Sequence, residues 1–285
     1  MNIKKIFLIV APKRFIKMRF KHNMGYKLDT KNPKTLTEKM YCFLLYNRNP
    51  IYTICADKVK VREYIKKKLG DEETAKICPY HYFVTDDPET ITIDMLPEKF
   101  VLKSNHASGH IIICEDKTTF NLEESKKQMA FWLKVNYFYE WGEAQYKNIK
   151  PMIICEEILE SDITDYRIFC FEGEPQFILV TKHDVKSTTG YAVGIYNLKW
   201  ELENNIFNLI ETPLICPKPQ NFEQMLSIAK KLSSDFSFVR IDLYEVLGKI
   251  YFAELTFTPN GGSFRFKDND IDLKYGSMIK GNLKN

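Results

Sequence analysis

Two neighbouring stretches near the carboxyl end of this 285-residue chain alternate polar and apolar residues. Arg240 and Asp242 alternate with valine, isoleucine and leucine in the first stretch, and Glu254 and Thr256 follow the same pattern in the second. Side chains two apart on a strand share one face of the sheet. If the strands form a hairpin that turns near Gly248, Asp242 and Glu254 lie opposite each other, with Cβ atoms roughly 5 Å apart.

Two carboxylates held this close repel each other unless a cation lies between them. Hard oxygen ligands favour Mg²⁺ over zinc, and Mg²⁺ in proteins commonly binds substrate phosphates as well. A surface carboxylate pair neutralised by Arg240 explains the same pattern equally well. The alternation therefore indicates either a magnesium–phosphate site or a surface ion pair.

A small, polar loop, Ser104 to Gly109, lies between two apolar runs and follows Lys103. Small side chains let backbone N–H groups approach phosphate oxygens, and a lysine supplies a point charge, so this hairpin suits a flap over phosphates. Most hairpin loops of this length bind no ligand. The chain has neither the Gly-x-x-x-x-Gly-Lys-Ser/Thr loop nor the Gly-x-Gly-x-x-Gly fingerprint, which excludes two common types of nucleotide site.

Helices and strands that would position these groups are interspersed along the chain. Amphipathic spacing and capping residues predict helices at 37–48, 57–70, 121–139 and 221–233. Apolar runs predict strands at 100–103, 110–114, 151–159, 166–171, 176–182, 238–243 and 249–256, with another around 191–200. Strand pairs on short loops between helices predict an α+β protein.

The composition excludes several classes of protein. A chain with 45% hydrophobic and 27% charged residues is typical of a folded globule and not of a disordered or coiled-coil chain. No apolar stretch approaches the roughly 18 residues of a membrane helix. Seven scattered cysteines without a Cys-x-x-Cys pair favour a reducing compartment, so a cytoplasmic location is expected.

The amino-terminal 28 residues carry eight lysines and arginines and no acidic residue. Such a segment predicts peripheral contact with an anionic polymer or the inner face of a membrane, or simply a solvated helix face. Nucleic acid is not expected as a partner, because the rest of the chain is nearly balanced in charge and carries no recognition motif.

Six strings follow one another along most of the chain, from about Lys31 to Gly276. They are NPKTLTEK, ADKVKVREYI, LPEKFVLKSNHASGH, EAQYKNIKPMIICEEILE, DYRIFCFEGEP and FVRIDLYEVLGKIYFAELTFTPNGG. In this order they resemble the TupA-like family of the ATP-grasp superfamily. The resemblance implies an ATP-grasp fold, in which two α+β lobes clamp Mg-ATP. The expected division is a basic helical segment over 1–55, a lobe with the phosphate flap over 56–155, and a lobe with the hinge and metal site over 156–285.

The resemblance also implies roles for individual residues. Those expected to bind nucleotide are Lys58 and Lys103, the flap residues Ser104, Asn105, His106, Ser108 and Gly109, the hinge residues Glu156, Glu157, Ile158 and Leu159, and Asp165 at the ribose. In the hinge, backbone groups would read adenine. Those expected to bind Mg²⁺ are Asp242, Glu254 and Thr256, the last in place of an asparagine common in the superfamily. Those expected to act at the phosphoryl group or the acyl acceptor are Arg240, Arg167 and Lys182.

ATP-grasp enzymes join a carboxylate to an amine or thiol through an acyl phosphate, so the resemblance implies such a ligase, with ATP and Mg²⁺ as cofactors. A uronic acid of a surface polysaccharide or its precursor is the expected acid, and an amino acid the expected amine. Glu143, beside a cluster of aromatic residues expected in the core, is a candidate acceptor-site residue. A glycosyltransferase and a non-catalytic nucleotide-dependent binding module are the alternatives. Asp268-Asn269-Asp270 resembles the metal motif of the former, although a solvated turn explains it better.

Overall fold

Two antiparallel β-sheets carry the polar residues singled out above, in a computed structural model that describes residues 3–159, 163–183, 191–203, 205–208, 213–281 and 283. Sheet A has the strand order β1-β4-β2-β3, formed by β1 (His81–Thr85), β2 (Phe100–Ser104), β3 (Ile111–Cys114) and β4 (Ile153–Glu156). Sheet B has the order β7-β6-β5-β8-β9, formed by β5 (Thr164–Phe171), β6 (Glu174–His183), β7 (Tyr191–Asn197), β8 (Phe238–Val246) and β9 (Lys249–Thr256). The predicted α+β class is confirmed.

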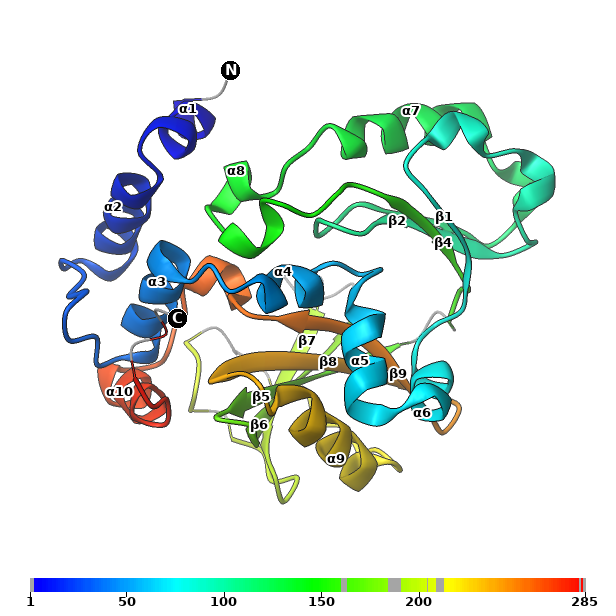
Figure 1. Cartoon of the computed structure of the whole chain (residues 1–285). Helices are drawn as coiled ribbons and strands as arrows, with labels where there is room; N and C mark the ends of the chain where they lie inside the picture. Colours follow the sequence, from blue (N-terminus) through cyan, green and yellow to red (C-terminus); the bar gives the residue numbers. More distant parts are fainter. Residues whose placement is uncertain are drawn as a thin grey trace.

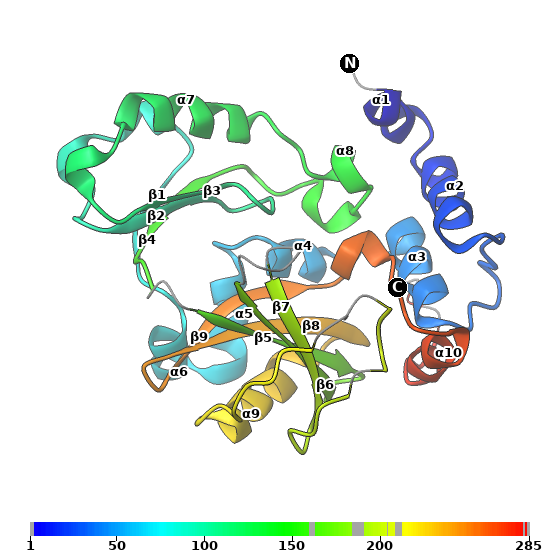
Figure 2. The ribbon, with the colours of Figure 1, turned by 180° about the vertical axis from the view of Figure 1, so that it is seen from behind.

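The two sheets lie one above the other with helices on their outer faces, so their inner faces point toward each other (Figures 1 and 2). Helix α7 (Leu122–Leu133) covers the outer face of sheet A, where Trp132 packs against Phe100 and Leu102 in a buried core. Residues alternate along β2, so Lys103, the neighbour of Leu102, faces sheet B instead. This alternation places charged residues between the lobes and apolar ones beneath the helices.

A larger core joins sheet B to helices on its outer face and at its ends. These helices are α3 (Leu36–Tyr46), α4 (Pro50–Ala56), α5 (Val61–Leu69), α6 (Asp71–Ile77), α9 (Phe222–Ser233) and α10 (Asn269–Ser277). Val61, Tyr64 and Ile65 of α5 are buried in this core, and the Tyr64 hydroxyl donates a hydrogen bond to the carbonyl of Leu232 (2.9 Å). The expected division places residues 56–78 with the flap, but Val61 to Cys78 pack in the core of sheet B, whereas Asp57 and Lys58 contact the loop after β2.

Several predicted boundaries are wrong in detail. The helix predicted at 121–139 ends at Leu133, and a short helix α8 (Phe138–Trp141) follows it. The break lies at Asn136, whose side-chain oxygen accepts a hydrogen bond from the Phe138 backbone (3.1 Å) and so starts the new helix. Strand β1 was not predicted. The short 3₁₀ helices are η1 (Pro88–Thr90), η2 (Ile93–Met95), η3 (Lys117–Thr119), η4 (Ala144–Tyr146) and η5 (Pro259–Gly262).

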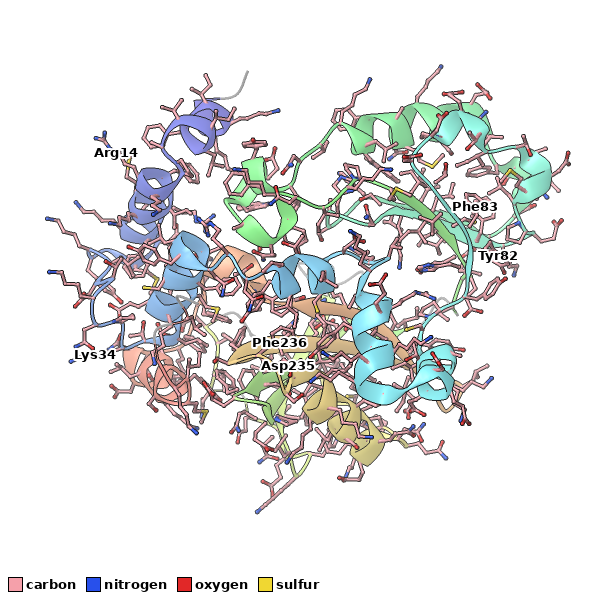
Figure 3. All side chains as sticks on the ribbon, in the orientation of Figure 1. Arg14, Lys34, Tyr82, Phe83, Asp235 and Phe236 are labelled. Atoms are coloured by element: carbon pink, nitrogen blue, oxygen red, sulfur yellow. The ribbon has the colours of Figure 1, made fainter. Side chains whose placement is uncertain are left out.

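The basic amino-terminal segment forms helices α1 (Ile3–Val10) and α2 (Pro12–Met24), which are separated at Pro12. Ile16 and Phe20 are buried against α3, so this segment is docked on the protein. Arg14 points away from the rest of the molecule (Figure 3), whereas Arg19 donates hydrogen bonds to buried and half-buried groups of the neighbouring elements. In the described part of the chain, no helix combines the length and apolar character required to cross a membrane.

Candidate functional site

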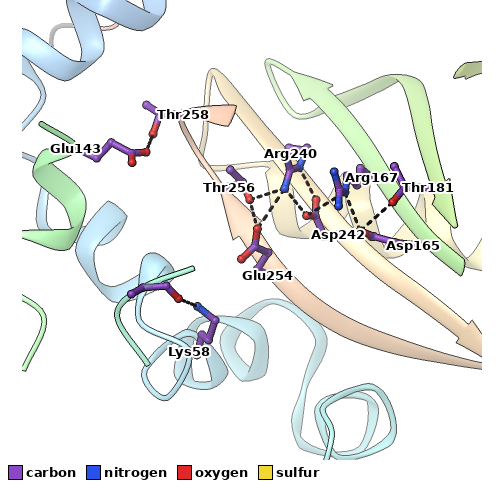
Figure 4. A network of polar contacts seen from close by, with 11 residues as sticks. Lys58, Glu143, Asp165, Arg167, Thr181, Arg240, Asp242, Glu254, Thr256 and Thr258 are labelled. Atoms are coloured by element: carbon purple, nitrogen blue, oxygen red, sulfur yellow. Dashed lines mark hydrogen bonds and ion pairs between the residues drawn. The ribbon is translucent and has the colours of Figure 1, made fainter. Parts of the chain in front are cut away.

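A cavity of about 920 Å³ lies between the inner faces of the two sheets. This volume is in the range of small-molecule binding sites. The sequence-predicted residues that line it are Lys58, Lys103, Ser108, Glu156, Glu157, Ile158, Leu159, Asp165, Arg167, Arg240, Asp242, Glu254 and Thr256. The fold therefore brings together groups that lie almost 200 positions apart in the sequence (Figure 4).

One extra residue in β9 places Glu254 opposite Asp242. Leu243 pairs with Phe252 but Asp242 pairs with Glu254, so Ala253 is a β-bulge. Without this bulge, Asp242 would lie opposite Ala253 and Glu254 would be displaced by one residue. The predicted pairing of the two carboxylates is thus present in the structure, but it depends on an irregularity that alternation does not reveal.

The Arg240 guanidinium lies between these two carboxylates. Its Nε donates a hydrogen bond to Asp242 Oδ1 (2.7 Å), and its Nη2 is 3.2 Å from Glu254 Oε1. Thr256 adds a hydrogen bond from its hydroxyl to Glu254 Oε1 (2.7 Å). Asp242 is only 4% exposed and the Arg240 side chain 12%, whereas the Glu254 side chain is 37% exposed, so the network runs from the interior of the sheet to the open cavity.

Burial and neighbouring charge act in opposite directions on this network. Burial raises the pKa of Asp242 to about 7, although Arg240 opposes the shift. Burial would also raise the pKa of Glu254, but Lys58 and Arg240 outweigh it and lower the pKa below its ordinary value. Glu254 is therefore held as a carboxylate, whereas full ionisation of Asp242 calls for more positive charge nearby than Arg240 supplies.

Asp165 and Arg167 extend the network across β5. The Arg167 Nε donates a hydrogen bond to Asp165 Oδ2 (2.7 Å) and is 4.0 Å from Asp242 Oδ2. Thr181 of β6 also reaches Asp165 Oδ2 (3.4 Å). The other carboxylate oxygen, Asp165 Oδ1, is buried and has no hydrogen-bond partner among the described residues. A buried acceptor without a partner is costly, so this oxygen is suited to a hydroxyl of a bound ligand.

On the opposite wall, Lys103 forms an ion pair with the carboxylate of Glu156. His81 Nε2 lies 3.4 Å from the second oxygen of that carboxylate. Burial alone would raise the pKa of Glu156, but His81 and Lys103 together lower it. The Glu156 side chain thus holds Lys103 in position, whereas the resemblance implied only a backbone role for Glu156. His81 escaped prediction because it lies on the unpredicted strand β1.

Lys58 connects the start of α5 to the loop after β2. Its Nζ donates a hydrogen bond to the carbonyl of Ala107 (2.8 Å), and its backbone N–H donates one to the carbonyl of Asn105 (3.0 Å). Burial lowers the pKa of Lys58, while the nearby Glu254 opposes that shift. Lys58 therefore lies between the loop and the carboxylates of sheet B (Figure 4).

Half of the predicted flap points away from the cavity. Asn105 is fully buried, and its Nδ2 donates hydrogen bonds to Asp57 Oδ1 (2.9 Å) and to the Lys150 carbonyl (3.0 Å). His106 is buried too and directs Nε2 at the carbonyl of Val135 (3.1 Å). Because their side-chain polar groups have partners within the protein, these side chains anchor the loop and do not point at the cavity.

Two more predicted residues take positions other than those expected. The Ser104 hydroxyl is paired with His110 Nδ1 (3.1 Å) behind the loop. Lys182 follows Thr181 on β6, and since Thr181 faces the cavity, alternation turns Lys182 to the opposite face of the sheet. Lys182 is thus not among the residues of the site. Only Ala107 and Ser108 of the loop tip line the cavity.

Glu143 lies in the cavity wall beneath α8, next to Tyr137 and Tyr146, which also line it. Its carboxylate accepts a hydrogen bond from the hydroxyl of Thr258, and Gln145 donates to the same hydroxyl (2.8 Å). Burial raises the pKa of Glu143 to about 7. The aromatic residues were expected only in the core. The signal that indicates otherwise is the presence of acidic residues, Glu140 and Glu143, among them.

Residues 38–280 match the family described as TupA-like ATPgrasp, which is most of the chain. This chain belongs to the TupA-like ATP-grasp family. The ATP-grasp fold that the resemblance implied is thereby confirmed. No curated protein shows a significant match to the sequence.

Several solved structures are similar to this TupA-like ATP-grasp protein at low identity. They include D-alanine–D-alanine ligase from Bacillus anthracis complexed with ATP (15% identity, 79% of this chain and 66% of that chain, TM-score 0.42). Another is D-alanine–D-alanine ligase from Helicobacter pylori (13% identity, 80% of this chain and 62% of that chain, TM-score 0.43). A third is the ATP-grasp ligase PsnB complexed with a phosphomimetic variant of its minimal precursor, Mg and ADP (12% identity, 80% of this chain and 59% of that chain, TM-score 0.44). This chain spans 59–66% of the length of these proteins.

The raised pKa of Glu143 predicts how stability depends on pH in this ATP-grasp protein. Between roughly pH 4.5 and 7, folded Glu143 keeps a proton that the unfolded chain releases, so stability falls as pH rises through this window. Glu143→Gln removes the titrating group. We therefore expect the stability of the variant relative to wild type to increase with pH. The difference in unfolding free energy, variant minus wild type, should be about 2 kcal/mol larger at pH 8 than at pH 5. Exposed Glu140→Gln on α8 is the control, and equal differences at both pH values would contradict the assignment.

The conformation of Gly109 at the loop tip leads to a second prediction, on Mg-ATP binding. Gly109 has a φ of +77° with open space around its Cβ position, and Gly25, at the end of α2, has a φ of +80° with equally open space. Valine at either site strains the backbone by about 1–2 kcal/mol. We expect Gly109→Val and Gly25→Val to lower the unfolding free energy similarly, but only Gly109→Val to weaken Mg-ATP binding in calorimetry. Equal Mg-ATP affinities in the two variants would show that the loop tip does not contact phosphate.

Proposed function

We propose that this protein is an ATP-dependent ligase that joins a carboxylate to an amine through an acyl phosphate. The observation that carries the proposal is the cavity itself, in which Lys58 and Lys103 lie on one side and Asp242, Glu254 and Arg240 on the other. Fixed positive charge around a phosphate chain is the main requirement of phosphoryl transfer. Membership of the TupA-like ATP-grasp family supports this use of the cavity.

The cavity offers groups for each part of ATP. Lys58 and Lys103 would bind the phosphates, and the unpartnered Asp165 Oδ1 would accept a hydrogen bond from a ribose hydroxyl. Adenine would lie at Ile158 and Leu159, which line the cavity just after β4. Glu157 is less suited to adenine, because its backbone N–H donates to the Tyr80 carbonyl (2.9 Å).

The oxygen groups of Asp242, Glu254 and Thr256 fit a Mg²⁺ ion. No cluster of three or more His, Cys, Asp or Glu side chains that could hold a metal occurs within the described ranges, so two carboxylates must share the ion with other ligands. Mg²⁺ is typically bound in this way, by one or two carboxylates together with phosphate and water oxygens. When bound, the ion would neutralise charge on the phosphoryl groups.

The proposed reaction has two steps. A carboxylate oxygen of the substrate attacks the γ-phosphorus of ATP, which forms an acyl phosphate and releases ADP. The amine nitrogen then attacks the acyl carbon, phosphate leaves, and one proton is lost from the nitrogen. Arg240 and Arg167 would stabilise charge on the transferred group. We assign the proton to Glu143, a buried carboxylate of the same cavity whose pKa is raised to about 7, which suits a base that works near neutral pH.

The finer identity of the substrates is also a proposal. From the family resemblance, we propose a uronic acid of a surface polysaccharide or its precursor as the acid and an amino acid as the amine. The exposed basic residues of α1 and α2 support peripheral contact with a membrane or an anionic polymer. The Asp268-Asn269-Asp270 motif does not support the glycosyltransferase alternative. Asp268 caps α10 by accepting a hydrogen bond from the Ile271 N–H (3.0 Å), and it does not line the cavity.

Replacing Glu254 with glutamine tests the proposed reaction. The change preserves shape but removes one negative charge from the metal site, so we expect ATP turnover to fall roughly 100-fold or more. The unfolding free energy should also decrease at neutral pH, because Lys58 and Arg240 stabilise the ionised form of Glu254. Exposed Glu123→Gln on α7 is the control.

Turnover is measured as ADP release, with the melting temperature recorded in Mg-ATP and in Mg-UDP-glucose. Mg-ATP should raise the melting temperature of the wild type, since a ligand of the native state stabilises it. The proposal is wrong if Glu254→Gln turns over ATP at the wild-type rate, or if UDP-glucose stabilises the protein more than ATP does.

A further inference from the structure

A second cavity, of about 660 Å³, adjoins the first, and no part of ATP or the metal has been assigned to it. Arg167 and Arg240 line both cavities, together with Trp141, Pro259 and Asn260. The two cavities are therefore neighbours that meet at the two arginines expected beside the transferred phosphoryl group.

The register of sheet B explains this arrangement. Arg167 pairs with Asp242 on one side and with Leu179 on the other, and Phe169 pairs with Arg240. All of these side chains lie on the inner face of the sheet. The carboxylates on β8 and β9 lie beneath the first cavity, while Phe169 and Leu179, on β5 and β6, form the floor of the second.

Helix α2 closes the second cavity from the side. Arg19 donates a hydrogen bond from Nη2 to the Gly261 carbonyl (2.8 Å) and another to the Trp141 carbonyl. Asn23 donates one from Nδ2 to the Ser263 hydroxyl (2.9 Å). Both residues precede position 38, where the match to the family begins. The amino-terminal helices thus contribute a wall of a cavity whose floor belongs to the ATP-grasp lobe.

The lining of the second cavity is positively charged. Four arginines line the cavity, at positions 19, 167, 240 and 265, and the described lining residues include no aspartate or glutamate. Arg167 and Arg240 are neutralised by Asp165 and Asp242. By contrast, the hydrogen bonds of Arg19 go to uncharged groups. The guanidinium of Arg265 makes no hydrogen bond or ion pair to any residue in the described ranges.

Apolar side chains also line the second cavity. Phe169, Phe207 and Phe264 line the cavity together with Leu179 and Val193. The rings of Phe207 and Phe264 are nearly parallel, with an angle of 15° between their planes. Apolar walls with a few charged groups are typical of sites that bind small molecules.

We propose that the second cavity binds the carboxylate substrate of the ligase, and that this substrate carries a second anionic group. The reacting carboxylate lies at Arg167 and Arg240, the uncharged ring lies against the phenylalanines, and Arg19 and Arg265 bind the second anionic group. This proposal rests on the proposed function and narrows its uronic acid substrate to one that carries at least one further anionic group, such as a chain of uronic acid units.

The test measures binding of trigalacturonate and of galacturonate by calorimetry, with and without Mg²⁺ and the non-hydrolysable ATP analogue AMP-PNP. We expect trigalacturonate to bind wild type at least tenfold more tightly than galacturonate. Arg265→Gln should weaken trigalacturonate binding roughly tenfold, since a hydrogen bond between charged groups is lost, and leave galacturonate binding nearly unchanged. Arg265 is exposed, so its replacement leaves the fold intact.

Arg14→Gln is the matched control, because Arg14 is an exposed arginine of α2 that points away from the cavity (Figure 3). It should bind both acids as wild type does. The inference is overturned if Arg265→Gln and Arg14→Gln bind trigalacturonate equally, if galacturonate binds as tightly as trigalacturonate, or if neither acid binds. Failure of Mg-AMP-PNP to bind would instead count against the proposed function, and the measurements without nucleotide would still decide the inference.

Discussion

Two carboxylates that lie opposite each other in one sheet, one of them buried, need positive charge between them, and the arrangement of the site follows from this requirement. Arg240 supplies part of that charge through hydrogen bonds to Asp242 and Glu254. The pKa of Asp242 is nevertheless raised to about 7 by burial, so the network is under-compensated as it stands. A divalent cation with its phosphate ligands would supply the missing charge.

On the sheet A wall of the cavity, a lysine needs negative charge nearby. Lys103 is a cation near the end of the inner strand β2, and the carboxylate of Glu156, which also contacts His81, neutralises it. Lys58 lies between the walls, bonded to the loop at Ala107 and close enough to Glu254 for their charges to interact. Sheet A therefore presents Lys103, the segment before α5 presents Lys58, and sheet B presents the carboxylates of Asp242 and Glu254 to one cavity. Phosphate groups between them would contact cations on both sides, which explains why the site is built from two lobes.

The sequence predicts the site better where alternation governs side-chain direction. The positions of Arg240, Asp242 and Glu254 follow from period-two spacing across a hairpin, although the bulge at Ala253 that completes the pairing leaves no such trace. Asn105 and His106 resemble phosphate ligands by residue type, yet their polar groups are bonded to the protein backbone, which only tertiary structure reveals. The basic amino-terminal run gives no sign that one of its arginines, Arg19, turns inward to line a cavity. Residue type thus identifies the chemistry, but burial decides which residues perform it.

The acyl phosphate is the central claim, and transfer of labelled oxygen tests it most directly. The protein is incubated with Mg-ATP, an amino acid mixture and trigalacturonate whose carboxylates carry ¹⁸O, and the released phosphate is analysed by mass spectrometry. If a carboxylate oxygen attacks the γ-phosphorus and the amine later displaces phosphate, one ¹⁸O appears in each phosphate, in equal amount to the amide formed. Amide formation with unlabelled phosphate, or release of ADP and phosphate without any amide, would contradict the account.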